Sequence, residues 1–185
     1  MTTGTQQVAK KSKSSQDNAV KAITAANGQP RIDGEIFRAV MRQLAGGVTV
    51  ITTMREGNPH GFTATAFCSV CAEPPTVLIV VNRTARTHPH IDARRHFAVN
   101  ILADDQTALA NRFAGKLENQ FEGMSYTIPD GGAPVFEGVS AHLQCVVSSR
   151  LDIGTHTIFI GDVVGGGTSE SDPLVYHAAR FGRVE

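Results

Sequence analysis

The 185-residue sequence predicts a mainly β protein, an antiparallel barrel of six or seven strands with a few short helices in its connections. Three observations lead to this prediction. Runs of β-branched and apolar residues recur along the chain. They do not alternate regularly with helical segments, which disfavours a parallel Rossmann sheet. No G-x-G-x-x-G or P-loop motif is present, so two common nucleotide-binding motifs are missing.

Residues 1–30 are predicted to form a disordered tail that precedes one domain at residues 31–185. The tail is rich in Lys, Ser and Gln, and it lacks both the apolar core of a secretory signal and the arginines of a transit peptide. Its four lysines and one aspartate give a net charge of +3, which leaves −3 for the remainder. A mildly acidic body gives little reason to expect nucleic-acid binding. No apolar run is long enough to cross a bilayer.

The first ordered element is expected to be a helix that Asp33 caps and that Gly46–Gly47 end. The apolar residues that recur at the spacing of one helical face are Phe37, Val40, Met41 and Leu44. Residues 48–54 are β-branched and read as a strand, and residues 61–67 can return as the second strand of a hairpin.

The middle of the chain predicts two strands and two helices. Residues 76–82 are nearly all apolar and predict a strand buried on both faces. Because Pro89 interrupts the next segment, a short helix is expected at residues 90–95. A strand follows at residues 96–102. The helix within residues 104–116 is expected to be capped by its leading aspartates and to end near its glycine.

From residue 139 onwards the pattern is again that of strands. The three strand-like segments are residues 139–153, 156–166 and 173–184. Gly154 lies between the first two segments, so a hairpin is expected to join them there.

Cys68 and Cys71 form a C-x-x-C pair, which in redox proteins works where the first cysteine begins a helix. Here the surrounding stretch is strand-like, and side chains three positions apart on a strand point to opposite faces. Such a pair does not easily close a disulfide, and a zinc site would need two further ligands. We therefore expect small buried cysteines. With Cys145 they number three, too few for a disulfide framework, which favours a reducing cytoplasm.

The seven histidines show no metal-binding spacing, so no metal site is predicted. His88 and His90 flank a proline in a polar connection, where a solvated loop is expected. His156 follows a Gly-Thr turn and opens an apolar strand, a position that faces either solvent or a ligand. No G-x-S-x-G elbow or distinctive carboxylate pair indicates hydrolase chemistry.

Hydroxyl and amide side chains interleave with small residues at several predicted strand ends. They are Thr63, Thr65, Ser69, Asn82, Thr84 and Thr87. Together with exposed backbone N–H groups they could hold a polar ligand that carries phosphate, and Arg83 and Arg86 could complement its charge. Ordinary β-branched threonines in a sheet are an equally good interpretation of this pattern.

Five segments, in order from about residue 35 to residue 183, resemble the flavin reductase-like family. They are FRAVMRQLAGGVTVITT, GFTATAFCSVCAEPPTVLIVVN, FAVNILADDQTALANRFAG, GTHTIFIGDV and PLVYHAARFG. The most specific parts are T-A-x-x-S-V-x-x-x-P-P and G-T-H in combination. Within the family, the sequence is most similar to the reductase components of two-component flavin monooxygenases, such as that of 4-hydroxyphenylacetate hydroxylase.

The resemblance implies an FMN-binding split β-barrel, usually a homodimer. Such a protein uses NADH or NADPH to reduce FMN or FAD, and the reduced flavin diffuses to a separate monooxygenase. A flavin carrier or sensor without turnover, and a flavin oxidase similar to pyridoxamine phosphate oxidases, are the alternatives on a related barrel.

The resemblance also implies roles for individual residues. The residues beside the isoalloxazine edge would be Thr63, Ala64 and Thr65. Those near the ring and ribityl chain would be Ser69 and Val70. Those at the ribityl and phosphate end would be Asn82, Thr84, Ala85 and Thr87. Those that close the outer side would be Phe113 and Lys116. The catalytic residue would be His156, which would face the nicotinamide, with Tyr176 and Phe181 near the stacked rings.

Three positions depart from the commoner family pattern. Thr65 stands where many relatives have asparagine, and Cys71 stands where many have serine. Phe181 replaces a tyrosine found in some relatives, which would remove a hydroxyl contact.

Overall fold

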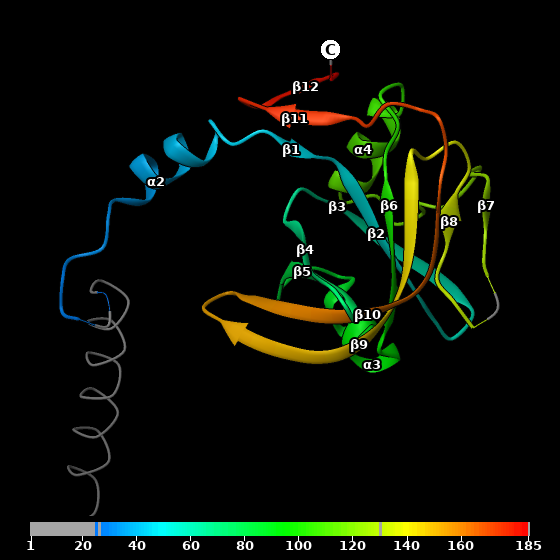
Figure 1. Ribbon diagram of the computed structural model, residues 1–185, viewed down its shortest axis with the longest axis horizontal. Coiled ribbons are helices and arrows are strands. Elements are labelled where there is room, and N and C mark those ends of the chain that lie inside the picture. The colour runs from blue at the N-terminus through cyan, green and yellow to red at the C-terminus, as the bar shows by residue number, and fades with distance from the viewer. Residues whose placement is uncertain (1–24, 26, 130, 185) are drawn as a thin grey trace, which may run out of the picture. The chain divides into compact units, whose positions relative to one another are not determined.

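The structure, a computed structural model, describes residues 25, 27–129 and 131–184 (Figure 1). The chain divides into two compact units, residues 1–43 and residues 44–185. Most of the predicted tail, residues 1–24 and 26, lies outside the described residues. The tail and the domain boundary at residue 31 therefore remain predictions.

The first unit contains helix α2 (Gly34–Met41). The Asp33 carboxylate accepts hydrogen bonds from two backbone N–H groups of the first turn, at 2.7 and 3.3 Å, which confirms the predicted cap. The helix ends at Met41, so the prediction that Gly46–Gly47 end it is wrong. Those two glycines instead form strand β1 (Gly46–Gly47) in the second unit.

The second unit is built on a seven-stranded antiparallel sheet with the strand order β3-β2-β6-β9-β10-β5-β4. Its strands are β2 (Thr49–Arg55), β3 (Asn58–Ala64), β4 (Phe67–Ala72), β5 (Pro75–Asn82), β6 (His96–Ile101), β9 (Ala141–Ile153) and β10 (His156–Thr168). The predicted hairpin at Gly154 joins β9 to β10, and its φ of +56° explains the glycine. The predicted antiparallel, mainly β fold is confirmed.

The connection between β3 and β4 shows how this sheet curls. These two strands are the edges of the sheet, yet only Thr65 and Ala66 separate them along the chain. Two residues span at most about 10 Å, so the two edges lie close together at this end. A hydrogen bond of 3.1 Å from the Val80 N–H to the Ala66 carbonyl fixes this two-residue connection against β5. The sheet therefore closes at one end and stays open elsewhere, as expected of a split barrel.

Two smaller sheets accompany the barrel. β1 pairs with β11 (Val175–His177), which pairs in turn with β12 (Arg180–Gly182), and β7 (Tyr126–Thr127) pairs with β8 (Val135–Phe136). The last predicted strand, residues 173–184, is thus a short hairpin. Its turn places Ala178 and Ala179 in the left-handed region, at φ 49° and 63°.

Two helices complete the second unit. α3 (His88–Arg94) begins two residues before the predicted start, because Pro89 lies in its first turn, where a proline is tolerated. α4 (Thr107–Ala114) ends before Gly115 as predicted, but its N-cap is Gln106, so the prediction of an aspartate cap is wrong. Among the described residues, no helix is long and apolar enough to cross a membrane.

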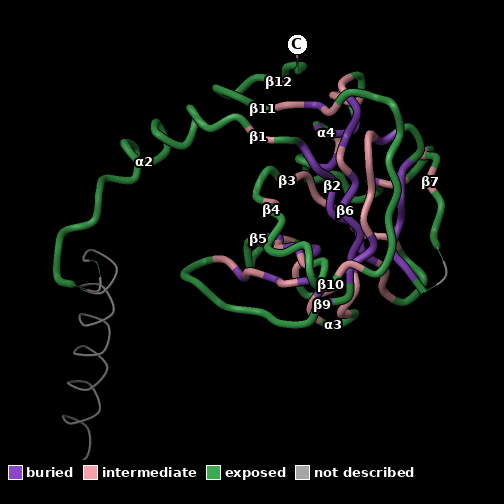
Figure 2. The backbone as a smooth tube through the Cα atoms, viewed as in Figure 1, coloured by how far each residue is buried: buried purple, intermediate pink, exposed green. Residues whose placement is uncertain are grey.

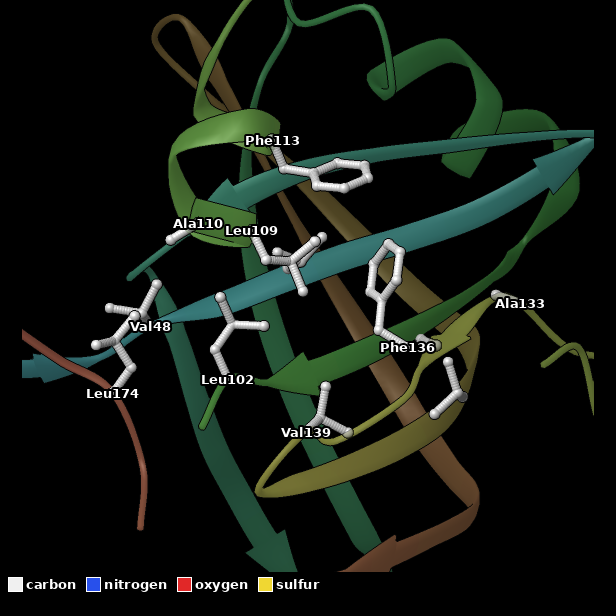
Figure 3. Close-up of a cluster of buried hydrophobic side chains, with 12 residues drawn as sticks. Val48, Leu102, Leu109, Ala110, Phe113, Ala133, Phe136, Val139 and Leu174 are labelled. Atoms are coloured by element: carbon white, nitrogen blue, oxygen red, sulfur yellow. The ribbon is translucent and has the colours of Figure 1, made fainter. Parts of the chain in front are cut away.

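Alternate residues of β2 and β6 supply two separate hydrophobic cores, and both strands are largely buried (Figure 2). Ile51 and Phe97 belong to the core inside the barrel, whereas Val50 and Ala98 face the second core. In that second core, the Phe136 ring points toward the Phe113 ring of α4, with centroids 5.1 Å apart (Figure 3).

Strand β5 differs from its prediction. Val77, Ile79 and Val81 are buried in the barrel core, but the intervening Leu78 and Val80 are only half-buried. The prediction of burial on both faces is therefore wrong for the single chain. Its outer face is apolar and partly open to solvent.

Candidate functional site

A cleft of about 580 Å³ opens where β3, the end of β5 and the end of α4 meet. The volume lies within the usual range for sites that hold small molecules or cofactors. The residues that line it are Gly61, Phe62, Thr63, Asn82, Thr84, Ala85, Arg86, Thr87, Phe113, Ala114, Gly115, Lys116, Glu118 and Gln120.

One wall is the turn after β5, which Asn82 organises. The Asn82 side-chain oxygen accepts hydrogen bonds from the Thr84 N–H and the Thr84 hydroxyl, both at 2.9 Å. Its backbone carbonyl accepts from the Ala85 N–H, also at 2.9 Å. Asparagine favours such a turn because its short amide reaches the backbone two residues on. The turn fixes residues 84–87 at the rim of the cleft.

The opposite wall is β3, against which α4 packs (Figure 1). The Thr63 hydroxyl donates to the Ala110 carbonyl at 2.6 Å, and the Thr87 hydroxyl donates to the Gly61 carbonyl at 3.2 Å. A side chain at Gly61 would lie 2.9 Å from the Phe113 ring, so only glycine allows this approach. Both threonine hydroxyls therefore donate hydrogen bonds within the protein. Only their oxygens remain free, and these can accept a hydrogen bond from a ligand.

The charge that lines the cleft favours an anion. Arg86 and Lys116 contribute +2 and Glu118 contributes −1, which gives a net formal charge of +1. The Arg86 guanidinium also donates to the Leu117 carbonyl at 2.5 Å, so it ties the β5 turn to the loop that follows α4. A guanidinium has five N–H donors, so further donors remain for a phosphate.

The structure brings half of the predicted site residues together in this cleft. Those that line it are Thr63, Asn82, Thr84, Ala85, Thr87, Phe113 and Lys116. Of the two arginines predicted for their charge, Arg86 lines the cleft and Arg83 does not. The predicted residues that do not line it are Ala64, Thr65, Ser69, Val70, His156, Tyr176 and Phe181.

His156 lies one strand away from the cleft. It is the first residue of β10, and its Cα pairs with that of Asn82 across the sheet. The imidazole Nδ1 lies 2.9 Å from the Thr155 hydroxyl, and the residue is half-buried. His156, at the start of β10, is thus a direct cross-strand neighbour of the cleft residue Asn82.

A second group of predicted residues gathers around β1. Tyr176 and Phe181 face each other across β11 and β12, with ring centroids 5.3 Å apart. Tyr176 also pairs with Gly46, and a Cβ at Gly46 would lie 4.0 Å from the Thr65 Cβ. Three predicted residues remain. Ala64 is half-buried at the end of β3, and Ser69 and Val70 are exposed on the edge strand β4.

Several cleft residues were not predicted from the sequence. Gly61 and Phe62 directly precede the predicted Thr63, so the local motif contained a signal for them. Glu118 and Gln120 lie in an irregular loop without a recognisable pattern. Their place in the cleft depends on how that loop folds back.

The cysteines differ from their prediction. Cys68 and Cys71 are exposed, not buried. A bulge in β4 places them opposite Leu78 and Thr76, two positions apart on β5, so they lie on the same face. The expected opposite orientation is wrong because it assumed an unbroken strand. Cys145 is buried, and this burial raises the pKa of its thiol to about 12. Among the described residues, no cluster of side chains suits a metal ion.

His88 and His90 do not lie in a solvated loop, as was predicted, but in the first turn of α3. The Thr157 hydroxyl donates to the Asp152 carboxylate at 2.6 Å. Its oxygen therefore accepts from His88 Nε2, at 2.8 Å, and this fixes the His88 tautomer.

The His90 ring stacks on His60 of β3, with centroids 3.7 Å apart and planes at 19°. Burial lowers the pKa of both imidazoles. For His60, the neighbouring His90, Arg86 and Arg55 lower the pKa further. For His90, Arg55 lowers the pKa, and Glu56 partly offsets this effect. The pair joins β3 to α3.

The sequence and the fold are similar to those of known proteins. A family model described as a flavin reductase like domain matches residues 41–185. The reductase component of a 4-nitrophenol 4-monooxygenase/4-nitrocatechol 2-monooxygenase from Rhodococcus opacus is 38% identical over 151 residues, which cover 82% of this chain and 81% of that protein. A flavin reductase (NADH) from Kitasatospora aureofaciens is 38% identical over 157 residues, with 82% of each chain covered.

Solved structures show the same relationship. An NADH:FAD oxidoreductase from Streptomyces globisporus, in complex with NAD and FAD fragments, superposes with a TM-score of 0.79 at 32% sequence identity. The match covers 84% of this chain and 96% of that one. The resemblance seen in the sequence is therefore confirmed, and the chain belongs to the flavin reductase-like family.

Proposed function

We propose that the protein is an NAD(P)H:flavin oxidoreductase that transfers a hydride from NADH or NADPH to FMN or FAD. The reduced flavin would then serve a separate flavin-dependent monooxygenase. Several relatives are reductase components or subunits of monooxygenases or hydroxylases. The observation that carries the proposal is the cleft, because it joins apolar walls to a cationic rim in a family of flavin reductases.

The residues of the cleft fit a flavin in their chemistry. Phe62 and Ala85 are partly exposed and offer apolar surface for a planar ring system, whereas the Phe113 ring is buried in the adjoining core. Thr84 and the cations Arg86 and Lys116 suit the ribityl hydroxyls and a phosphate. A bound flavin would supply the hydride acceptor, since the cofactor carries the redox chemistry and the protein supplies binding and orientation.

His156 is proposed to orient the nicotinamide. Its β10 position beside Asn82 places an imidazole next to the cleft without filling it. An imidazole can donate one hydrogen bond and accept another, as the recognition of a carboxamide requires. Tyr176, Phe181 and Thr65, grouped around β1, would flank the stacked rings.

A homodimer in the cytoplasm completes the proposal. Cross-strand partners share one face of a sheet, so Val80 and Ile158 face outward beside Leu78. On the adjoining hairpin, Leu151 and Ile153 are 56% and 54% exposed. This apolar surface adjoins Asn82 and His156, and a second copy that covered it would remove it from water. Sedimentation should accordingly report twice the monomer mass.

Steady-state kinetics tests the proposed activity. NADH or NADPH consumption, followed by the absorbance of the reduced nicotinamide, should require added FMN or FAD and saturate with it. A flavin carrier would bind flavin without any consumption. An oxidase would consume oxygen with pyridoxamine phosphate and leave the nicotinamide untouched. Either result would replace the proposal.

A further inference from the structure

The loop after α4, residues 115–122, supplies Lys116, Glu118 and Gln120 to the cleft but contains no helix or strand. It therefore has no regular ladder of backbone hydrogen bonds to fix its shape. We propose that Arg112, which does not line the cleft, is a positioning residue for flavin binding because its guanidinium sets the path of this loop. The proposal rests on the proposed function and deepens it.

The Arg112 guanidinium reaches three backbone carbonyls of the loop. Its Nε donates to the Gln120 carbonyl at 2.6 Å, and its Nη2 donates to the carbonyls of Asn119 and Glu122 at 3.2 and 2.6 Å. A planar fork of donors suits this task, since one rigid group satisfies acceptors at successive positions of a turn. An ammonium is a compact point donor and does not present this fork.

Gln120 reciprocates the interaction. Its side chain is buried and donates to the carbonyls of Arg112 and Gly115, at 3.3 and 3.2 Å. The end of α4 and the turn at residue 120 are thus joined in both directions. Gln120 also lines the cleft. Only this one residue therefore separates the Arg112 guanidinium from a ligand bound there.

A second guanidinium holds the loop from the wall formed by the turn after β5. Arg86 donates to the Leu117 carbonyl at 2.5 Å and itself lines the cleft. Arg112 holds the later part of the loop, since it contacts the carbonyls of residues 119, 120 and 122. If the Arg112 side chain is removed, the loop keeps the Arg86 contact and the hydrogen bonds of the Gln120 side chain but loses three others. The less restrained loop must then be ordered when flavin binds, a cost that weakens affinity.

The test compares flavin affinity in Arg112→Ala and Arg112→Lys with affinity in the full-length wild type. FMN fluorescence titration should show a dissociation constant raised about tenfold or more in both variants, because lysine keeps the charge but not the fork. The KM for NADH should stay near the wild-type value. Added guanidinium ion should partly restore FMN affinity to Arg112→Ala, whereas sodium at the same ionic strength should not.

Arg94→Ala is the matched control. Arg94 also donates to a backbone carbonyl, that of Gly131 at 3.1 Å, but neither residue lines the cleft. Its FMN affinity should therefore match that of the wild type.

Unchanged FMN affinity in a folded Arg112→Ala would overturn the proposal, as would an equal loss in Arg94→Ala. Failure of both Arg112 variants to fold would assign the residue to stability and overturn it as well. A wild type that binds FMN but does not oxidise NADH would contradict the proposed function alone, because the titration needs no turnover.

Discussion

Individual residues of the cleft divide into those that hold the walls and those left to meet a ligand. Thr63 and Thr87 donate their hydroxyl protons to backbone carbonyls of the protein. Arg86 makes one hydrogen bond to the loop and retains other donors. A charged ligand is therefore expected to be bound by the cationic side chains and the backbone more than by the threonines.

Arg86→Ala should weaken the binding of FMN more than that of riboflavin, which lacks the phosphate. The loss of one charge-assisted contact predicts a dissociation constant for FMN about tenfold higher or more. Fluorescence titrations with both ligands measure the difference, and any general effect of the loosened loop should appear equally with riboflavin. Arg83→Ala is the control, since Arg83 lies in the same turn but does not line the cleft. Equal losses for FMN and riboflavin would contradict a phosphate role.

His156→Ala should leave flavin affinity nearly unchanged and lower kcat/KM for NADH by about tenfold or more, the effect of losing one orienting contact of roughly 1.4 kcal/mol. The reason is its place on β10, beside Asn82 but outside the lining of the cleft. Steady-state kinetics and a flavin titration on the same preparation separate the two effects. Unaltered NADH kinetics would instead show that His156 has no role in orienting the nicotinamide.

At the scale of elements, most strands followed from the sequence, but their faces and ends did not. Apolar β-branched runs predicted β2, β5, β6, β9 and β10 because this pattern is local. The bulge in β4 could not be predicted, since it depends on register with β5, and it reversed the orientation inferred for Cys71. The start of α3 was missed because a proline was taken as an interruption, although it is tolerated in a first turn.

The stacked pair His60 and His90 joins β3 to α3 and should make the fold sensitive to acid. Both pKa values lie below the ordinary 6.5 of an unfolded histidine. The unfolded chain therefore binds more protons as the pH falls below about 6.5, so the free energy of unfolding decreases over that range. Stability from this pair is present above pH 6.5 and lost on acidification.

Replacing both rings by phenylalanine keeps an aromatic stack but removes both titrating groups. Urea unfolding at about pH 7.5 and about pH 5.5 should show a smaller loss of stability in His60→Phe/His90→Phe than in the wild type. Some loss should remain, because burial also lowers the pKa of His96. An identical loss in both proteins would show that the pair does not carry the acid sensitivity.

At the scale of the whole molecule, the barrel was predictable and the complete cleft was not. Residues of the two local motifs, such as Thr63 and Asn82, were predicted and are brought together. Glu118 and Gln120 were missed because they lie in an irregular loop, which Arg112 contacts through both its side chain and its backbone carbonyl. The periodicity of a sequence does not indicate such contacts. The long-range folding of β3 onto α4 is what turns separate motifs into one site.

The most direct test is anaerobic mixing of the purified protein with FMN or FAD and NADH. The visible absorbance of oxidised flavin should disappear in step with oxidation of the nicotinamide, one molecule for one. Deuterium at the transferred C4 position should slow this step if a hydride moves between the two rings. A flavin that binds to the protein yet stays oxidised in the presence of NADH and NADPH would contradict a reductase.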